Sequence, residues 1–378
     1  MLLYKPVNPA ARPAVAQRIP ELDGLRGIAI LMVVGFHYLN NQLQDPESAV
    51  GRAVSQVTSF GWTGVDLFFI LSGFLIGTGL IRNKHSPRLF ATFYARRFLR
   101  IVPNYYLLIA IFFVIVNLPY FNSSIFVHRS DVIPWWSYLL MVHNIFMGRM
   151  NTLGSNAVNV TWSIGIEEQF YLFFPLIVYF SPKRWIPYIL LVAIALASVI
   201  RPFYADWIPR YVFLPCRMDA IAFGALVAYC NEEFDLEAVM KKGRKWYFLA
   251  MALNVVFCLY LFYRYQDLGV NKHFYITIFF GGCLLAALAY KNTLYGAFLR
   301  NRLLMWIGTI SYSLYLFHYL ILALMEYSLL HYNGGVMLSN GKDGLVSVLS
   351  LGLAFLFAWF VYRNLETPLV RYGKRFKY

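Results

Sequence analysis

Residues 21–38 read Glu-Leu-Asp-Gly-Leu-Arg-Gly-Ile-Ala-Ile-Leu-Met-Val-Val-Gly-Phe-His-Tyr, and this stretch decides how the fold is interpreted. It is an apolar run with an arginine near its start and a histidine deep inside it. An α-helix turns about 100° and rises about 1.5 Å per residue, so Arg26 and His37 lie on one helical face, about 16 Å apart along the axis. A fixed cation and a titratable base on one face of an apolar helix suggest a chemical site.

The composition of the whole chain is that of a membrane protein. Of its 378 residues, 60% are hydrophobic and 13% are charged, whereas soluble domains carry about 25% charged residues. Apolar runs of about 20 residues recur along the whole length, as in proteins with many membrane-spanning helices. The net charge of +15 is carried largely by short loops between these runs. We therefore expect the bilayer as a partner and no nucleic acid.

The expected fold class is all-α: a polytopic transmembrane helical bundle of about ten spans, with both termini cytoplasmic. This topology places the basic loops on the cytoplasmic side, as the positive-inside rule requires. If 134–147 also crossed, the later basic loops would face outward, so we predict that this stretch is re-entrant or interfacial. The expected spans are 24–44, 61–81, 101–118, 161–180, 185–202, 210–230, 246–264, 273–290, 304–328 and 344–362.

The expected organisation is a single membrane domain in the plasma (inner) membrane. A cytoplasmic N-terminal segment, 1–20, precedes an integral membrane domain, 21–372, and a cytoplasmic basic tail, 373–378, follows it. The four cysteines all lie within apolar runs, so neither a disulfide framework nor a thiolate metal site is expected. No metal is expected elsewhere.

Ionisable residues occur inside the predicted spans, where they are costly and usually functional. At a rise of about 1.5 Å per residue, their depths converge on one layer on the outer side of the bilayer midplane. The members of this layer are His37, Asp66, Glu167, Arg217, Asp219 and His318. We predict that such a layer, shared by five spans, forms a site.

A second polar layer is expected at the cytoplasmic surface. The stretch 94–103, Tyr-Ala-Arg-Arg-Phe-Leu-Arg-Ile-Val-Pro, places Arg96, Arg97 and Arg100 at the start of the third span, level with Arg26. Arg96 and Arg100, like Arg97 and Arg100, are one helical turn apart. Their guanidinium groups suit phosphate geometrically.

Each signal also has a structural interpretation. The arginines at 96–100 could serve only as positive-inside residues. Asp66, Arg217 and Asp219 could form ion pairs between helices, and His318 or His37 could be a hydrogen-bonded packing residue. Asp23 could act only at the helix start or pair with Arg26.

Together these motifs resemble the integral membrane acyltransferase-three family, which includes O-antigen and exopolysaccharide O-acetylases and some macrolide acyltransferases. The resemblance extends from about residue 18 to 372, with six motifs in order. They are residues 21–29, the Arg26-x10-His37 spacing, 64–76 (Gly-Val-Asp-Leu-Phe-Phe-Ile-Leu-Ser-Gly-Phe-Leu-Ile), Arg97-x-x-Arg100, 162–171 (Trp-Ser-Ile-Gly-Ile-Glu-Glu-Gln-Phe-Tyr) and 311–318 (Ser-Tyr-Ser-Leu-Tyr-Leu-Phe-His).

The resemblance implies transfer of an acyl group, commonly acetyl, from cytoplasmic acyl-CoA to a hydroxyl, often of a glycan or glycolipid. The family's Arg-x10-His pair matches Arg26 and His37, and its Ser-x-x-x-Glu matches Ser163 and Glu167. Ser72 and Glu168 lie in the same motifs and are further candidates. Some relatives carry an additional extracytoplasmic esterase-like domain. Because this chain ends at Tyr378, we expect that it completes acceptor handling itself or with a separate extracytoplasmic or glycan-assembly protein.

The expected mechanism combines both polar layers. Arg97 and Arg100, with Arg26 and Arg96, would hold the CoA phosphates. His37 would act as a general base or as a covalent acyl carrier, and Glu167 or Asp66 would orient its ring. The competing hypothesis is a secondary transporter that uses the same buried charges, and a membrane scaffold is the third.

Overall fold

The computed structural model describes residues 18–40, 49–121, 132–265, 269–330 and 341–378, and every regular element in them is helical. The all-α fold class is therefore confirmed. The long helices are α1 (Pro20–Gly35, continued by a π-helical turn, Phe36–Asn40), α3 (Gly64–Arg82), α4 (Leu89–Val116), α8 (Trp162–Phe180), α9 (Ile186–Ile200), α11 (Leu214–Glu233), α13 (Arg244–Tyr265), α14 (Lys272–Ala289), α16 (Arg302–Leu330) and α17 (Gly341–Val361).

Short helices connect or extend the long ones. They are α2 (Ala49–Thr58), α6 (Trp135–Leu139), α7 (His143–Arg149), α10 (Trp207–Val212), α12 (Leu236–Lys242), α15 (Leu294–Leu299) and α18 (Thr367–Gly373), with a π-helical segment, Tyr362–Glu366, between α17 and α18.

Nine helical segments in the described residues are long and apolar enough to cross a bilayer, and each overlaps one of the predicted spans. The tenth predicted span, 161–180, is also a helix, α8, of 19 residues. It is not among the nine segments, and it carries Glu167, Glu168 and Gln169 in succession. Together the apolar helices make this a multi-pass membrane protein. That both termini are cytoplasmic stays a prediction.

The stretch 134–147 forms two short helices, α6 and α7, of five and seven residues. Neither is long enough to cross a bilayer, which needs about 20 helical residues. The segment is anchored by His143, which is fully buried and lies 2.9 Å from the hydroxyl of Thr161. Burial lowers the pKa of His143 to about 4, so its ring is neutral near pH 7.

The third predicted span begins earlier than expected. We placed its start at 101, after the arginines, but α4 begins at Leu89 and continues through Pro103. Arg96, Arg97 and Arg100 therefore lie on the helix itself. This happens because the sequence before Pro103 is amphipathic, and the helix can be longer than the apolar run it contains.

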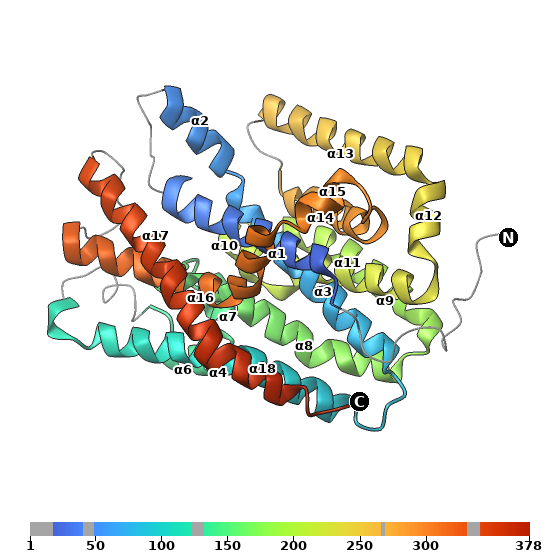
Figure 1. The fold of residues 1–378 in the computed structure, drawn as a ribbon, viewed down its shortest axis with the longest axis horizontal. Coiled ribbons are helices and arrows are strands. Elements are labelled where there is room, and N and C mark those ends of the chain that lie inside the picture. Colours follow the sequence, from blue (N-terminus) through green and yellow to red (C-terminus); the bar gives the residue numbers. More distant parts are fainter. Residues whose placement is uncertain (1–17, 41–48, 122–131, 266–268, 331–340) are drawn as a thin grey trace.

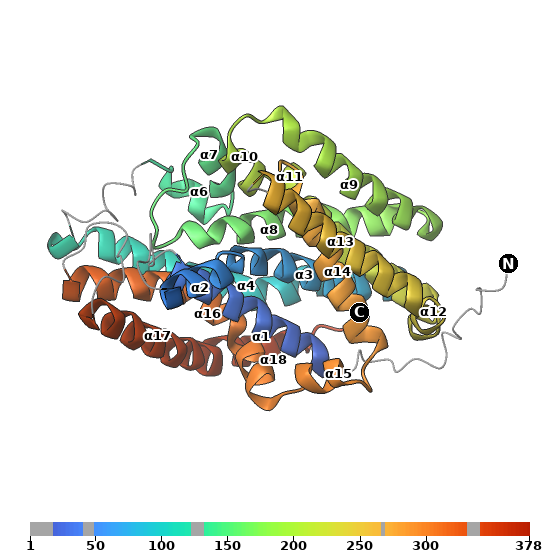
Figure 2. The same cartoon turned by 90° about the horizontal axis from the view of Figure 1, so that it is seen from above.

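Four long helices, α3, α4, α8 and α16, lie in the middle of the molecule when it is seen from above (Figure 2). The helices α9 and α11 lie on one side of them in this view, and α1, α17 and α18 on the other. Figure 1 shows α4 and α18 side by side, whereas α13 lies at the edge. The candidate site lies among the central helices and α1.

Two pairs of helices approach so closely that only glycine fits between them. In the first pair, a Cβ added to Gly308 of α16 would lie 1.9 Å from the backbone oxygen of Asp23 in α1. In the second, a Cβ on Gly73 of α3 would lie 1.9 Å from the backbone oxygen of Ile221 in α11. Small residues at such contacts are typical of membrane helices, which associate mainly through close packing.

The Gly308 contact predicts a stability difference between two glycine substitutions. Gly308→Ala should lower the unfolding free energy by about 1–3 kcal/mol, because the backbones must move apart. Gly352→Ala in α17 is the matched control, since no atom lies within 4 Å of its added Cβ. Thermal unfolding of the two purified variants in detergent measures the difference. Equal unfolding midpoints would show that the α1–α16 contact is looser than described.

Candidate active site

A first cavity, which we call the arginine cavity, lies among α1, α3, α4, α8 and α16 and has about 740 Å³ of empty space. Arg26, Arg97 and Arg100 line it. Within the described residues, Arg97 and Arg100 form no salt bridge, although the Arg97 guanidinium carbon lies 5.6 Å from the ring centre of Tyr171. Arg26 is 3.4 Å from Asp23. The cavity therefore presents guanidinium groups that an anionic ligand can engage.

Two glutamates lie near these arginines and limit their excess charge. Glu167 lines the cavity beside Ser72 and Tyr171, whose hydroxyls are in hydrogen-bond contact. Glu366, in the π-helical segment after α17, is buried and accepts a hydrogen bond from Ser313 at 2.8 Å. It interacts electrostatically with Arg100 and Arg26. Glu366 thus helps to compensate the buried arginine charge.

A second cavity, which we call the aromatic cavity, contains His37 and has about 1280 Å³ of empty space. Its aromatic lining comes from separate parts of the chain: the π-helical turn after α1, the short turn before α3, the start of α8, α10 and α16. These residues are Phe36, Trp62, Trp162, Trp207, Tyr211, Tyr315 and Tyr319. About 390 Å³ of this space is comparable with the volume of a small-molecule site, and such sites measure about 300–1,000 Å³, so the cavity is large enough for a small organic ligand.

The two cavities meet end to end. Four parts of the chain contribute lining residues to both cavities. They are α1, α3 with the turn before it, α8 with the turn before it, and α16. In α1, Arg26 lines the first cavity and Val33–His37 the second; in α16, Ser311 lines the first and Tyr319 the second. Val65 and Tyr315 line both cavities. They form the wall that separates the arginines from His37.

Tyr315 is held in this wall by its hydroxyl group. The hydroxyl donates to the backbone oxygen of Val160 at 2.8 Å and also lies 2.8 Å from the hydroxyl of Ser163. Its ring makes an edge contact with Phe68. The Ser163 predicted from the motif therefore lies at the junction of the two cavities.

His37 contacts a second histidine rather than a carboxylate. Its Nδ1 is 2.9 Å from Nε2 of His318, and its ring stacks on Tyr319 with a centroid distance of 4.5 Å. His318 Nδ1 lies 3.0 Å and 2.8 Å from the backbone oxygens of Leu314 and Tyr315. Carbonyl oxygens only accept hydrogen bonds, so Nδ1 of His318 carries the proton and Nε2 of the neutral ring is the acceptor.

This chain of bonds fixes the tautomer of His37. Its Nδ1 must donate to His318, which leaves the Nε2 lone pair of the neutral ring without a proton. That nitrogen belongs to the side chain that lines the aromatic cavity. His37 can therefore accept a proton from a ligand there. This differs from the expectation that Glu167 or Asp66 orients the ring, because the contacts of those two residues lie elsewhere.

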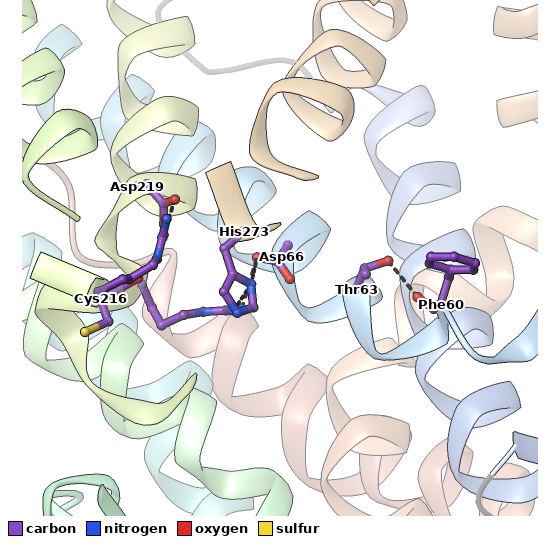
Figure 3. Close-up of polar contacts among 8 residues, drawn as sticks. Phe60, Thr63, Asp66, Cys216, Asp219 and His273 are labelled. Atoms are coloured by element: carbon purple, nitrogen blue, oxygen red, sulfur yellow. Dashed lines mark hydrogen bonds and ion pairs between the residues drawn. The ribbon is translucent and has the colours of Figure 1, made fainter. Parts of the chain in front are cut away.

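Asp66 belongs to a fully buried charge cluster with Arg217 and His273. Its Oδ1 is 3.0 Å from Arg217 Nη2 and 3.4 Å from His273 Nδ1. A neighbouring pair joins Asp219 to Arg201, which also donates to the backbone oxygen of Cys216 at 2.7 Å. Figure 3 shows Asp66 beside His273, with Asp219 and Cys216 farther along the same region. For these residues the structural interpretation, ion pairs that join helices, matches the contacts.

The remaining predicted residues lie outside the two cavities. Arg96 is half-buried and donates to the backbone oxygen of Phe376 at 2.9 Å and 2.6 Å, so it holds the C-terminal residues against α4 instead of lining the arginine cavity. Asp23 accepts from Arg18 at 2.6 Å. Glu168 is half-buried beside Glu167, and it lines neither cavity.

Several site residues were missed because the sequence gives them no distinctive context. His273 lies at the first turn of α14 and Arg201 at the end of α9, where polar residues are ordinary. Glu366 lies beyond 362, where we expected the last span to end; the helix instead continues through the π-helical segment into α18. For Tyr315, the only indication of a role in the site was its place in the motif 311–318.

The fold and these two cavities define a multi-pass membrane protein with two adjoining cavities that polar and aromatic side chains line. A profile of the acyltransferase-3 family, described as an acyltransferase domain, matches residues 19–363. The chain belongs to this family. No solved structure matches it significantly.

Curated relatives are similar over nearly the whole chain. The O-acetyltransferase OatA of Staphylococcus aureus strain NCTC 8325 is 27% identical over 382 aligned residues, covering 94% of this chain and 58% of the relative. OatA of Staphylococcus aureus strain MRSA252 gives the same values. The chain thus spans a little over half the length of these relatives.

The buried ion pair predicts a stability loss that surface pairs do not share. Asp66→Asn should lower the unfolding free energy by about 3–5 kcal/mol, because Arg217 then remains buried without its counter-ion. The control is Glu237→Gln, which breaks an exposed pair with Lys241 and should leave the unfolding midpoint unchanged. Chemical denaturation in detergent compares the two. Similar midpoints would mean that the Asp66–Arg217 pair does not hold α3 and α11 together.

Proposed function

We propose that the protein is a membrane O-acyltransferase that moves an acyl group from acyl-CoA to a hydroxyl of a carbohydrate or glycosylated acceptor. The observation that carries this proposal is the end-to-end arrangement of an arginine cavity and an aromatic cavity, with His37 facing the second. Membership of the acyltransferase-3 family and the relatives named O-acetyltransferase support it and favour acetyl as the acyl group.

The donor would bind in the arginine cavity. Arg26, Arg97 and Arg100 line one space, and guanidinium groups hold phosphate oxygens through paired, charge-assisted hydrogen bonds. The thioester end of acetyl-CoA would extend along the face of α1 that leads from Arg26 to His37. It would reach the wall formed by Val65 and Tyr315, where the two cavities meet.

The acceptor hydroxyl would be activated by His37. Its Nε2 takes the proton of the hydroxyl as the oxygen attacks the thioester carbonyl, and an ester C–O bond replaces the C–S bond. The CoA thiolate leaves and takes up the proton from the His37 imidazolium. His318 is a positioning residue in this scheme, because its bond to His37 Nδ1 fixes the reactive tautomer.

The sequence pattern supports a direction for the reaction. The basic loops predict that the arginine end faces the cytoplasm, where acyl-CoA is available, and that the aromatic cavity faces the opposite side of the plasma membrane. A glycan or glycolipid would then be acylated outside the cytoplasm. A separate extracytoplasmic or glycan-assembly protein remains a proposed partner.

The transporter hypothesis is less well supported. A transporter that used Asp66 and Asp219 would need to protonate or expose them, yet each forms an ion pair with a fully buried arginine. The arginine cavity would also have no evident role in transport. Acyl transfer accounts for both cavities.

The donor proposal predicts a difference between neighbouring arginines of α4. Arg100→Gln should weaken acetyl-CoA binding about tenfold or more, because a charge-assisted contact to phosphate is lost. Arg96→Gln should leave the affinity unchanged, because Arg96 contacts the C-terminal residues outside the cavity. Calorimetric titration of the purified protein measures both. An equal loss in the two variants would contradict the assignment of the cavity.

The proton-transfer proposal predicts that His37 and His318 affect turnover but not donor binding. His37→Ala should abolish transfer of labelled acetyl from acetyl-CoA to glycan acceptors. His318→Leu should lower kcat by about 100-fold, since general-base catalysis contributes about 10²–10⁴-fold and the ring of His37 loses its fixed tautomer. Donor affinity should be unaltered in both. Normal kcat in His37→Ala would refute the role of His37.

A further inference from the structure

The aromatic cavity contains two cationic side chains that the proposed chemistry does not use. Arg210 of α10 and Lys272 at the start of α14 both line it, together with His37. Among the residues that the structure describes, none that lines this cavity is acidic. Asp66, a buried carboxylate that contacts the lining residue His273, is already paired with Arg217. The described lining therefore carries a positive charge that it does not itself neutralise.

Arg210 is held in a fixed position while part of its guanidinium group stays available. Its Nε donates to the backbone oxygen of Asp206 at 2.9 Å, and its Nη2 donates to that of Ala205 at 2.5 Å. Both bonds are to neutral carbonyls, and within the described residues Nη1 has no hydrogen-bond partner. A side chain that serves only solubility would not need this support. The arrangement preorganises one cation for a ligand.

Lys272, at the start of α14, is the second cation of this lining. Its Nζ is 5.3 Å from the ring centre of Trp62, and no carboxylate among the described residues pairs with it. The cation–π contact holds the ammonium group without neutralising it. Lys272 and Arg210 thus present two cations, on different helices, to one space.

The aromatic rings that line the same cavity form one cluster of tilted and edge contacts around Tyr211. The ring centres of Trp162 and Tyr211 are 4.4 Å apart, those of Trp207 and Tyr211 are 5.9 Å apart, and those of Trp62 and Tyr211 are 6.3 Å apart. The C–H face of a pyranose ring packs against such a surface, while its hydroxyls remain available. One of those hydroxyls could then lie near His37.

We propose that the acceptor is a saccharide with an anionic group, a carboxylate or a phosphate, that Arg210 and Lys272 bind while the sugar ring lies on the aromatic surface. This deepens and rests on the proposed acyl transfer, because it names the acceptor class for the same cavity. The anion would fix the saccharide in one orientation and so determine which hydroxyl reaches His37. A neutral saccharide would bind more weakly and without a fixed orientation.

The test is equilibrium binding to the purified full-length protein, followed by tryptophan fluorescence, because Trp62, Trp162 and Trp207 line the cavity. In one arm 4-nitrophenyl β-glucuronide is compared with 4-nitrophenyl β-glucoside. In the other, a disaccharide linked to farnesyl diphosphate is compared with the same disaccharide linked to farnesol. In at least one arm the anionic probe should bind about tenfold tighter. Preference in the first arm identifies an acidic sugar, and preference in the second a glycolipid phosphate.

The variants show whether the two cations cause the preference. The double variant, Arg210→Gln with Lys272→Gln, should bind the anionic and neutral probes with nearly equal affinity. The control is Arg149→Gln, which removes an exposed positive charge at the end of α7, a helix packed against α10, outside the cavity lining. It should leave the preference for the anionic probe unchanged.

Each other outcome would overturn the proposal. These outcomes are equal affinity for anionic and neutral probes in both arms, no binding of any probe, or an unchanged preference in the double variant. His37→Ala should retain the preference, because it keeps both cations. If the preference is present but no acetyl transfer occurs, the proposed function fails while the anion site stands. If acetyl is transferred to neutral acceptors and no probe shows an anionic preference, the proposed function stands while the anion site fails.

Discussion

The close packing of α1 against α16 is the constraint on which the site depends. Gly308 allows the two backbones to approach until an added Cβ would lie 1.9 Å from the Asp23 oxygen. The same pair of helices carries His37 and His318, whose ring nitrogens are 2.9 Å apart. A wider separation of the helices would break this bond, and the tautomer of His37 would no longer be fixed. Helix packing and acid–base chemistry are therefore linked in one contact.

The buried charges divide into two groups with different tasks. Asp66 forms a buried ion pair with Arg217, and Asp219 with Arg201, and both pairs join helices. Arg97 and Arg100 are half-buried, line a cavity and form no salt bridge within the described residues. A cation that leaves water without a direct partner is costly, so it is usually retained because a ligand completes its environment. We therefore interpret the paired charges as structural and propose that the cavity arginines bind a ligand.

Much of the fold was predictable from the sequence, because apolar length and charge placement determine membrane helices. Each of the ten predicted spans corresponds to a helix. The shared face of Arg26 and His37 stays a prediction, because α1 ends at Gly35 and His37 lies in the π-helical turn that follows it. The start of α4 at Leu89 was not predicted, because hydropathy marks the apolar run and not the amphipathic turns before it. Glu366 was missed for a similar reason, since the helix continues beyond the last apolar run.

The partners within the site could not be predicted, because they depend on which helices are neighbours. The contact between His37 and His318 joins residues 281 positions apart, and that between Arg217 and Asp66 joins residues 151 apart. Depth in the membrane placed these residues in one layer, but depth does not specify pairs. For this reason a carboxylate was expected beside His37, where the structure has a histidine.

We propose that donor and acceptor occupy two cavities that meet at Val65 and Tyr315. A cryo-EM map of the full-length protein with an acetyl-CoA analogue, in which the thioester sulfur is replaced by methylene, tests this most directly. The account predicts phosphate density beside Arg97 and Arg100, with the acyl end at Tyr315. Density for the phosphates beside Trp62 and Trp207 instead would contradict it.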